Sequence, residues 1–254
     1  MSGDFLTVEF ALLIAIGFVA QLVDGALGMA FGVISTTAML TIGLPPAQAS
    51  AIVHTAEVFT TAASATSHLW YRNVDWRLVL RLGIAGVAGA VLGAWILSNV
   101  DATAIRPVIF GYLLFVGLFI LWRALAMVAT RDAPAVWTAP VGFIAGFLDA
   151  SGGGGWGPVA TSTLVGSGHA PRLAVGSVNT TEFFVTVAAA TTFFVELGGS
   201  PLKQLIPLVI GGLLAAPLGG WAVRHIPARM LMFLVGFLIV GLSAWQIARA
   251  LKVL

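Results

Sequence analysis

The sequence predicts an all-α polytopic membrane protein made of two five-segment inverted repeats with broken or re-entrant helices, giving 8–10 membrane segments. Hydrophobic residues make up 59% of the 254 residues and charged residues 9%, and the mean hydropathy is +1.02. This composition is far more apolar than that of a water-soluble domain. Apolar runs also recur along the whole chain, and an internal duplication predicts the repeats.

The apolar segments form two similar sets of five. Those of the first half are 5–22, 28–44, 47–70, 77–97 and 106–126, and those of the second half are 136–148, 156–167, 172–195, 203–223 and 230–251. A helix needs about 20 mostly apolar residues to cross a bilayer. The first two segments of each set are nearly continuous, so the pattern leaves open whether they cross the membrane or re-enter it.

The two sets are copies of one unit. At an offset of 125 residues, 18–63 aligns with 143–188 without gaps, and 15 of the 46 positions are identical. The identities include rare acids and prolines that similar composition alone would not align, namely Asp24 with Asp149, Pro46 with Pro171 and Glu57 with Glu182. We therefore divide the chain into a first membrane repeat, 1–127, and a second, 128–254.

An odd number of segments per repeat would give the two repeats opposite orientations in the membrane. The loops near 72–81 and 123–131 are basic and the loop near 99–101 is not, so the positive-inside rule places the first two in the cytoplasm. In the second repeat the loop near 196–203 is neutral and the loop near 224–229 is basic. Equivalent loops are therefore predicted on opposite sides, as inverted repeats require.

Both chain termini are then predicted to lie outside, although Arg249 and Lys252 count against this. Asp4 and Glu9 stand where a signal peptide would carry basic residues, so we expect the first apolar run to be retained. The absence of cysteine excludes disulfides and thiolate metal sites. The 12 Lys and Arg are dispersed over short loops, which argues against nucleic acid as a partner.

The break between the first two segments of each repeat is the first candidate site. In the second repeat Asp149 is followed by four consecutive glycines and a tryptophan, and in the first repeat Asp24 precedes Gly28. Each glycine costs a helix about 1 kcal/mol relative to alanine, but it lets successive N–H groups point into one concavity. We predict a substrate anion site there, formed by Gly28, Gly152, Gly153, Gly154, Gly155 and Trp156.

Structural explanations stand beside this one. Close helix packing explains glycines in membrane proteins generally, and we prefer it for Gly86, Gly89 and Gly93. Trp156 is either an aromatic wall for the substrate or a packing residue. The acids at the two breaks, Asp24 and Asp149, either cap the N–H groups that follow or act as coupling-ion ligands.

The third segment of each repeat carries the second candidate site. His54-Thr55-Ala56-Glu57 aligns with Asn179-Thr180-Thr181-Glu182, and each Glu follows its proline by 11 residues, which places it about 16 Å along a helix and near mid-membrane. A carboxylate at this depth is expensive and is usually functional. The predicted ion-coupling residues are Glu57, Glu182, Asp24 and Asp149; the additional substrate-binding residues are His54, Thr55, Asn179 and Thr180. The structural alternative is that each Glu hydrogen-bonds backbone opened by a neighbouring break.

The duplicated core, the Gly152–Gly155 run followed by Trp156-Gly157-Pro158, and Gly176-Ser177-Val178-Asn179-Thr180 together resemble the sulfite exporter TauE/SafE family of membrane transporters. The resemblance covers nearly the whole chain. It implies transport, with export favoured, of sulfite or an organosulfonate such as sulfoacetate across a bacterial inner membrane. The first repeat departs from the glycine-rich pattern and reads Ala26-Leu27-Gly28-Met29-Ala30, so we expect one asymmetric anion site.

We therefore predict a secondary transporter that works by alternating access, in which protonation of the buried acids relieves their repulsion of the anion. Sodium coupling stays open, and so do an anion channel, a transporter of another small carboxylate or oxyanion, and a scaffold subunit. No His-rich cluster or HExxH motif is present, so we expect neither an enzyme nor a metal or other cofactor. The expected partners are a small anion and the lipid bilayer, with homo-oligomerisation left open.

Overall fold

The computed structural model describes residues 8–126, 138–198, 202–218 and 228–251, and these residues form helices and short connections without any strand. The helices of the first half are α1 (Val8–Leu27), α2 (Phe31–Thr41), α3 (Pro46–Trp70), α4 (Trp76–Asn99) and α5 (Ala102–Ala126). Those of the second half are α6 (Thr138–Gly152), α7 (Ser162–Gly166), α8 (Pro171–Leu197), α9 (Leu202–Ala215) and α11 (Ala228–Ala250). A π-helical turn, η1 (Gly157–Thr161), precedes α7, and a 3₁₀ turn, η2 (Ala216–Leu218), follows α9.

The sequence explains where the long helices begin. Pro46 and Pro171 occupy the first turns of α3 and α8, where a missing N–H costs nothing. Asp75 caps α4, because its side chain accepts a hydrogen bond from the Arg77 N–H at 2.8 Å. Five of the described helices are long and apolar enough to cross a membrane. The predicted class, an all-α polytopic membrane protein, is confirmed.

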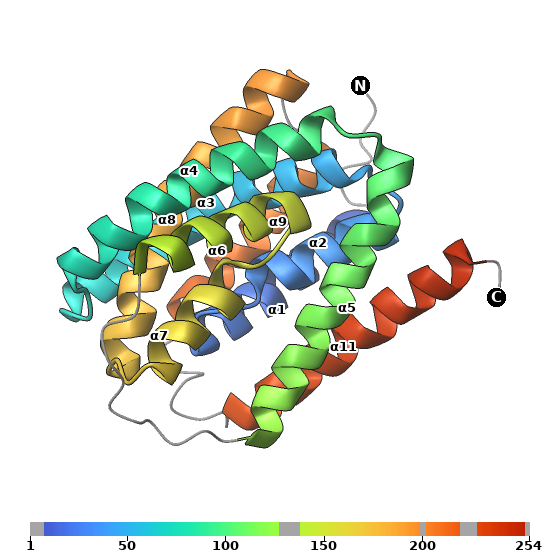
Figure 1. Ribbon diagram of the computed structural model, residues 1–254. Helices are drawn as coiled ribbons and strands as arrows, with labels where there is room; N and C mark the ends of the chain where they lie inside the picture. Colours follow the sequence, from blue (N-terminus) through green and yellow to red (C-terminus); the bar gives the residue numbers. More distant parts are fainter. Residues whose placement is uncertain (1–7, 127–137, 199–201, 219–227, 252–254) are drawn as a thin grey trace.

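The first two helices of each half form a hairpin that begins and ends at the same end of the molecule (Figure 1). Glu9, at the start of α1, pairs with Lys203 of α9 at 3.0 Å, and Arg106 near the start of α5 donates to the carbonyl of Leu40 near the end of α2. The start of α9 and the start of α5 lie at one end, because Asn99 and Glu196 at the ends of α4 and α8 are joined at 3.1 Å. The α1–α2 pair therefore has the arrangement expected of a re-entrant hairpin, and α1 alone is also long enough to cross a membrane.

The α6–α7 hairpin enters from the opposite end. Helix α6 runs parallel to α4, with Gly142 beside Leu82 and Gly146 beside Gly86, so the two helices begin together. Helix α8, which follows α7 after a short turn, begins beside the α3–α4 loop, where the Asp75 N–H donates to Ser177 Oγ at 2.8 Å. The two hairpins are thus arranged alike in the two halves, and their re-entry into the bilayer stays a prediction.

Helices of the two halves pack in reciprocal pairs. Helix α1 packs on α9 and α4 packs on α6, while α3 packs on α8 and α5 packs on α11. In the α3–α8 pair the helices are antiparallel: the ring of His54 lies 5.9 Å from that of Phe193, and His68 lies 3.3 Å from Asn179. Exchanging the halves maps the first two pairings onto each other and each of the last two onto itself, which is the relation expected of inverted repeats. The predicted joint between repeats falls almost wholly outside the described residues.

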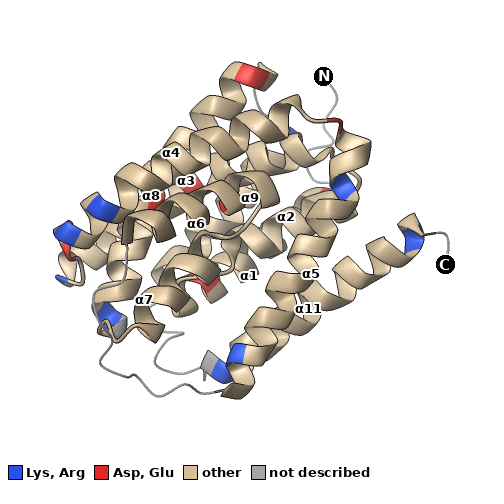
Figure 2. Ribbon diagram, viewed as in Figure 1, with Lys and Arg blue, Asp and Glu red and all other residues tan. Residues whose placement is uncertain are grey.

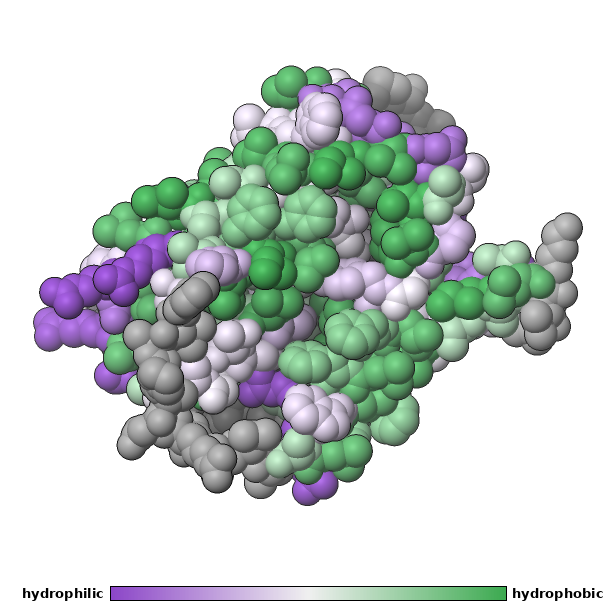
Figure 3. Space-filling model, viewed as in Figure 1, coloured by the Kyte–Doolittle hydropathy of each residue, from purple (hydrophilic) through white to green (hydrophobic). Residues whose placement is uncertain are grey.

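Charge is distributed unevenly between the two ends of the molecule (Figure 2). Among the described residues, most of the Lys and Arg lie where α3 and α5 end and where α4, α8 and α11 begin, whereas acids and bases are about equally frequent at the other end. The positive-inside rule therefore predicts that the basic end faces the cytoplasm. Between the ends, Figure 3 shows a broad hydrophobic face, as expected of a surface against lipid tails.

Candidate functional site

The tips of the two hairpins meet in the middle of the molecule. Both tips have a glycine in the left-handed region, Gly28 with φ of 65° and Gly153 with φ of 74°, at equivalent repeat positions. A side chain on Gly153 would place its Cβ 2.2 Å from Thr36 of α2. The hydroxyl of Thr161 also donates to the Gly28 carbonyl at 3.0 Å, so each tip is held by the other hairpin.

Asp149 organises the glycine-rich tip. Its Oδ1 accepts hydrogen bonds from the N–H groups of Gly155 and Trp156 at 2.7 and 3.0 Å, and its main-chain carbonyl accepts those of Gly153 and Gly154. The predicted concavity of N–H groups is therefore filled by the protein's own carboxylate in this conformation, which is the capping arrangement. In the first repeat the equivalent carboxylate makes a longer contact, from Asp24 Oδ1 to the Phe31 N–H at 3.4 Å.

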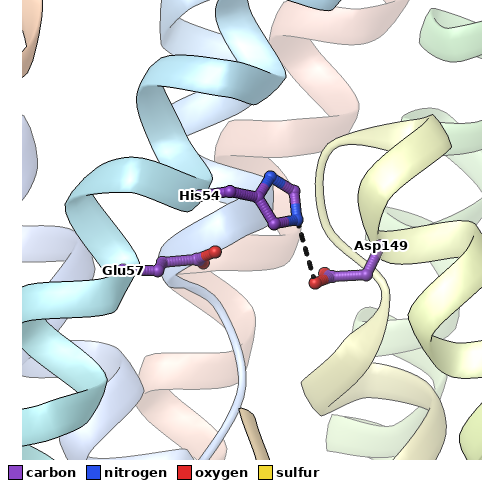
Figure 4. A group of neighbouring side chains, drawn as sticks. All are labelled: His54, Glu57 and Asp149. Atoms are coloured by element: carbon purple, nitrogen blue, oxygen red, sulfur yellow. Dashed lines mark hydrogen bonds and ion pairs between the residues drawn. The ribbon is translucent and has the colours of Figure 1, made fainter. Parts of the chain in front are cut away.

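His54 joins this tip to α3 (Figure 4). Its Nε2 lies 3.2 Å from Asp149 Oδ2, and its Nδ1 lies 2.8 Å from the carbonyl oxygen of Ser50. The Ser50 hydroxyl donates to the carbonyl of Ala150 at 2.8 Å, which adds a second link between α3 and α6. The imidazole is only 1% exposed, so these contacts are made away from water.

Glu57 points toward the same group (Figure 4). One ring nitrogen of His54 and one carboxyl oxygen each of Glu57 and Asp149 lie within 4.8 Å of one another. Among the described residues Glu57 Oε2 has no hydrogen-bond partner, and neither has Glu182 Oε2 on α8, although both side chains are buried. A buried carboxyl oxygen without a partner is costly, so the structural alternative, in which each Glu hydrogen-bonds opened backbone, does not account for these two atoms.

The side chains of the threonine and asparagine candidates are engaged with partners other than the His54, Glu57 and Asp149 group. The hydroxyl of Thr55 donates to the Ala51 carbonyl at 2.6 Å, and that of Thr180 donates to the Gly176 carbonyl at 2.8 Å. The Asn179 amide nitrogen lies 3.3 Å from His68 Nε2, while its Oδ1 is buried without a hydrogen-bond partner among the described residues. Their predicted role as substrate donors stays a prediction.

Trp156 and the remaining glycines have packing contacts. The indole is fully buried, donates from Nε1 to the Val178 carbonyl at 3.1 Å, and lies against Gly86. A Cβ on Gly89 or Gly93 would approach carbonyl oxygens of α6 to 2.1 or 2.6 Å, so the packing interpretation of these glycines holds. Gly152 faces the ring of Tyr112. An additional substrate contact of Trp156 stays a prediction.

Three residues around the site are absent from the sequence-based set. Ser50 fixes the His54 ring, and its position one helical turn before His54 was the available signal. Gly32 lies against Glu57, because a Cβ on it would lie 3.1 Å from Glu57 Oε1. The available signal for Gly32 was that it aligns with an identical residue, Gly157, in the repeat alignment. The hydroxyl of Tyr112 donates to the Gly154 carbonyl at 2.8 Å; no sequence pattern connects residues so far apart.

The arrangement is that of a membrane protein with buried acids at the meeting point of two hairpins. Comparison with models of known families matches residues 13–245 to the family described as "Sulfite exporter TauE/SafE". The chain belongs to this family. The matched region includes both hairpin tips and both Glu-bearing helices, so the TauE/SafE resemblance inferred from motifs is confirmed.

A curated relative supports the same conclusion. Over 238 residues this TauE/SafE chain is 43% identical to "Probable membrane transporter protein YtnM" of Bacillus subtilis (strain 168), an alignment that covers 90% of the chain and 79% of the relative. No solved structure matches the chain. The protein is therefore a multi-pass membrane transporter and not an enzyme.

Proposed function

We propose that the protein exports a small sulfur oxyanion, sulfite or an organosulfonate such as sulfoacetate, across the bacterial inner membrane by alternating access. The family description supports the substrate class. The observation that carries the proposal is the junction of the two hairpin tips with α3 and α8. Amide N–H groups and buried carboxyl groups of both repeats gather there, and the hairpins enter it from opposite ends of the molecule.

The Asp149 carboxylate supports the choice of an anionic substrate. Its Oδ1 accepts two N–H groups at the start of a helical segment, a position that stabilises negative charge. A sulfonate or sulfite oxygen has the same acceptor chemistry as a carboxylate oxygen. In the proposed cycle the substrate oxyanion takes the N–H groups of Gly155 and Trp156 in place of Asp149.

Burial of the site supports alternating access over a channel. His54, Glu57, Asp149 and Glu182 are between 1% and 6% exposed, so solvent reaches none of them freely from either end. A substrate can enter only after the hairpins or the Glu-bearing helices move. Closure on both sides is an expected state of a transporter cycle, whereas a conducting channel needs a continuous path.

The test is flux into proteoliposomes that contain the purified protein, using radiolabelled sulfite and sulfoacetate with protein-free liposomes as the background. Saturable uptake that is competed by the other sulfur oxyanion is the expected result, and the double variant Glu57→Gln, Glu182→Gln should abolish it. Glu196→Gln is the matched control, because this exposed carboxyl at the end of α8 lies away from the junction. Non-saturable flux would point to a channel, and saturable flux of carboxylates alone would replace the substrate class.

A further inference from the structure

The contacts of His54 fix where protons must lie. A carbonyl oxygen only accepts hydrogen bonds, so the 2.8 Å contact between His54 Nδ1 and the Ser50 carbonyl requires a proton on Nδ1. The Ser50 hydroxyl oxygen also lies 3.2 Å from His54 Nδ1. It cannot supply the proton of that contact, because it donates its own proton to the Ala150 carbonyl. The histidine therefore presents Nε2, and not Nδ1, to Asp149.

A second proton must lie between His54 and Asp149. Nε2 and Oδ2 are 3.2 Å apart, and two bare lone pairs at this distance would repel each other. One proton between them gives either an imidazolium with a carboxylate or a neutral imidazole with a carboxylic acid. Both forms hold the same number of protons, so the pair binds one exchangeable proton whichever atom carries it.

We propose that the His54–Asp149 pair is the coupling-proton site of the transporter, and that it carries one proton with each transported anion. This inference rests on the proposed function and names its coupling ion. The site bridges α3 of the first repeat and the glycine-rich tip of the second, so loss of the proton breaks one of the two hydrogen-bonded links between α3 and the α6 arm and leaves the link from Ser50 to Ala150. Asn179 occupies the position equivalent to His54 and cannot bind such a proton, so the second half lacks an equivalent site.

The carboxylate of Asp149 couples the proton to the anion. Its Oδ1 uses the N–H groups that the substrate needs, and its Oδ2 faces the shared proton. When a substrate oxygen takes those two N–H groups, Asp149 loses its stabilisation as an anion and needs the proton. Anion and proton therefore favour each other's binding, and by thermodynamic reciprocity each raises the affinity for the other.

Other titratable groups surround the pair from several elements. They are Glu57 on α3, Asp24 of α1, Glu182 of α8 and the Tyr112 phenol of α5. The Glu57 carboxyl group faces the pair, and its Oε2 is buried and unpaired among the described residues, so the group offers an acceptor to which the departing proton can pass.

The direct test is solid-state NMR of the full-length protein in lipid bilayers, labelled with ¹⁵N-histidine and ¹³C-aspartate. The His54→Asn variant identifies the His54 signals among those of the four histidines. Over about pH 5 to 10, the His54 Nε2 and Asp149 carboxyl signals should change together at one pH, reporting loss of one shared proton. Asp149→Asn should remove that transition and leave Nδ1 protonated.

Three outcomes would overturn the proposal, and none requires transport to be observed. The two groups could titrate separately, or hold their proton unchanged over the whole range. Alternatively, equimolar Zn²⁺ could displace the proton reversibly, which would make the group a metal site.

Transport gives the second test. Sulfoacetate is the probe, because it has no titratable proton near neutral pH, whereas sulfite itself binds one. Two rates are measured in wild-type proteoliposomes: net uptake of sulfoacetate driven by a pH gradient, acid outside, and exchange of external for internal sulfoacetate. The gradient should raise the ratio of net uptake to exchange. In His54→Asn this ratio should be the same with and without the gradient. A ratio that the gradient still raises in His54→Asn overturns the coupling role; absence of wild-type exchange with every sulfur oxyanion instead overturns the proposed function and leaves the NMR result to stand alone.

Discussion

At the scale of single residues, Asp149 connects the parts of the site. One oxygen accepts two N–H groups of the glycine-rich tip, the other faces His54, and the main-chain carbonyl receives two further N–H groups. The tip needs glycine because its backbone enters the left-handed region while α2 lies directly against it. Geometry at this tip therefore depends on the absence of side chains as much as on the carboxylate.

Gly153→Ala tests this dependence. The substitution places a Cβ at φ of 74° and 2.2 Å from Thr36, so we expect a loss of at least about 1–3 kcal/mol in stability from backbone strain, with crowding in addition. Thermal unfolding in detergent measures the effect. Gly166→Ala is the control, because a Cβ there meets nothing within 4 Å. Equal melting temperatures for the two variants would show that the tip is not held as described.

At the scale of elements, α4 and the α6 hairpin arm pack with their backbones in near contact. Gly89 and Gly93 of α4 face carbonyl oxygens of α6, and Gly142 and Gly146 of α6 face carbonyl oxygens of α4. Small residues on both helices permit this close approach. Inside a bilayer the hydrophobic effect does not drive helices together, so their association depends on packing contacts of this kind. The α6 arm is short, so its position depends strongly on its packing against α4, in addition to its hydrogen bonds with α3.

Gly89→Ala should weaken that packing. Its Cβ would lie 2.1 Å from the Phe143 carbonyl oxygen, and we expect a destabilisation of about 1–3 kcal/mol, with reduced transport as the arm shifts. Gly111→Ala in α5 is the matched helix-interior control; nothing lies within 4 Å of its Cβ, and alanine favours the helix. Melting temperature and sulfoacetate uptake are measured together. A Gly89→Ala protein as stable as Gly111→Ala would contradict the packing account.

At the scale of the whole molecule, the reciprocal pairing of helices places equivalent positions at opposite ends. Ile42 follows α2 and Ser167 follows α7, and the two positions are equivalent in the repeat alignment. Inverted repeats in a bilayer therefore predict that one position faces outward and the other faces the cytoplasm.

Because the chain has no cysteine, Ile42→Cys and Ser167→Cys can be examined one at a time without a background. In intact cells, a membrane-impermeant maleimide should label Ile42→Cys and should label Ser167→Cys only after the membrane is opened. Labelling of both positions from the same side would contradict the inverted arrangement. The reverse pattern would keep the inversion and exchange the two faces.

The all-α polytopic membrane class was accessible from the sequence, because the apolar segment lengths are local features. The duplicated acids, prolines and glycines also predicted two repeats. The contacts of the site were not. The alignment marked Asp149 and His54 separately, but only the fold shows that residues 95 positions apart share a hydrogen bond. The sequence also offered the glycine N–H groups as free anion donors, whereas Asp149 holds them; no local pattern distinguishes a cap from a ligand site when both use the same N–H groups.

Export and proton coupling are compatible at this scale. A sulfur oxyanion of charge −2 leaving with one proton moves a net charge of −1 outward, which a membrane potential negative inside favours by about 2.3 kcal/mol per 100 mV. The potential can therefore drive the export even though the proton moves against its own gradient.

The most direct measurement of the central claim is proton movement during sulfoacetate uptake. Proteoliposomes would contain a pH-sensitive dye, and K⁺ with valinomycin would hold the potential at zero so that charge movement alone cannot draw protons. Addition of sulfoacetate outside should acidify the interior, with one proton entering per sulfoacetate, and His54→Asn should lose this acidification. Entry of sulfoacetate into wild-type vesicles with no change in internal pH would contradict the account.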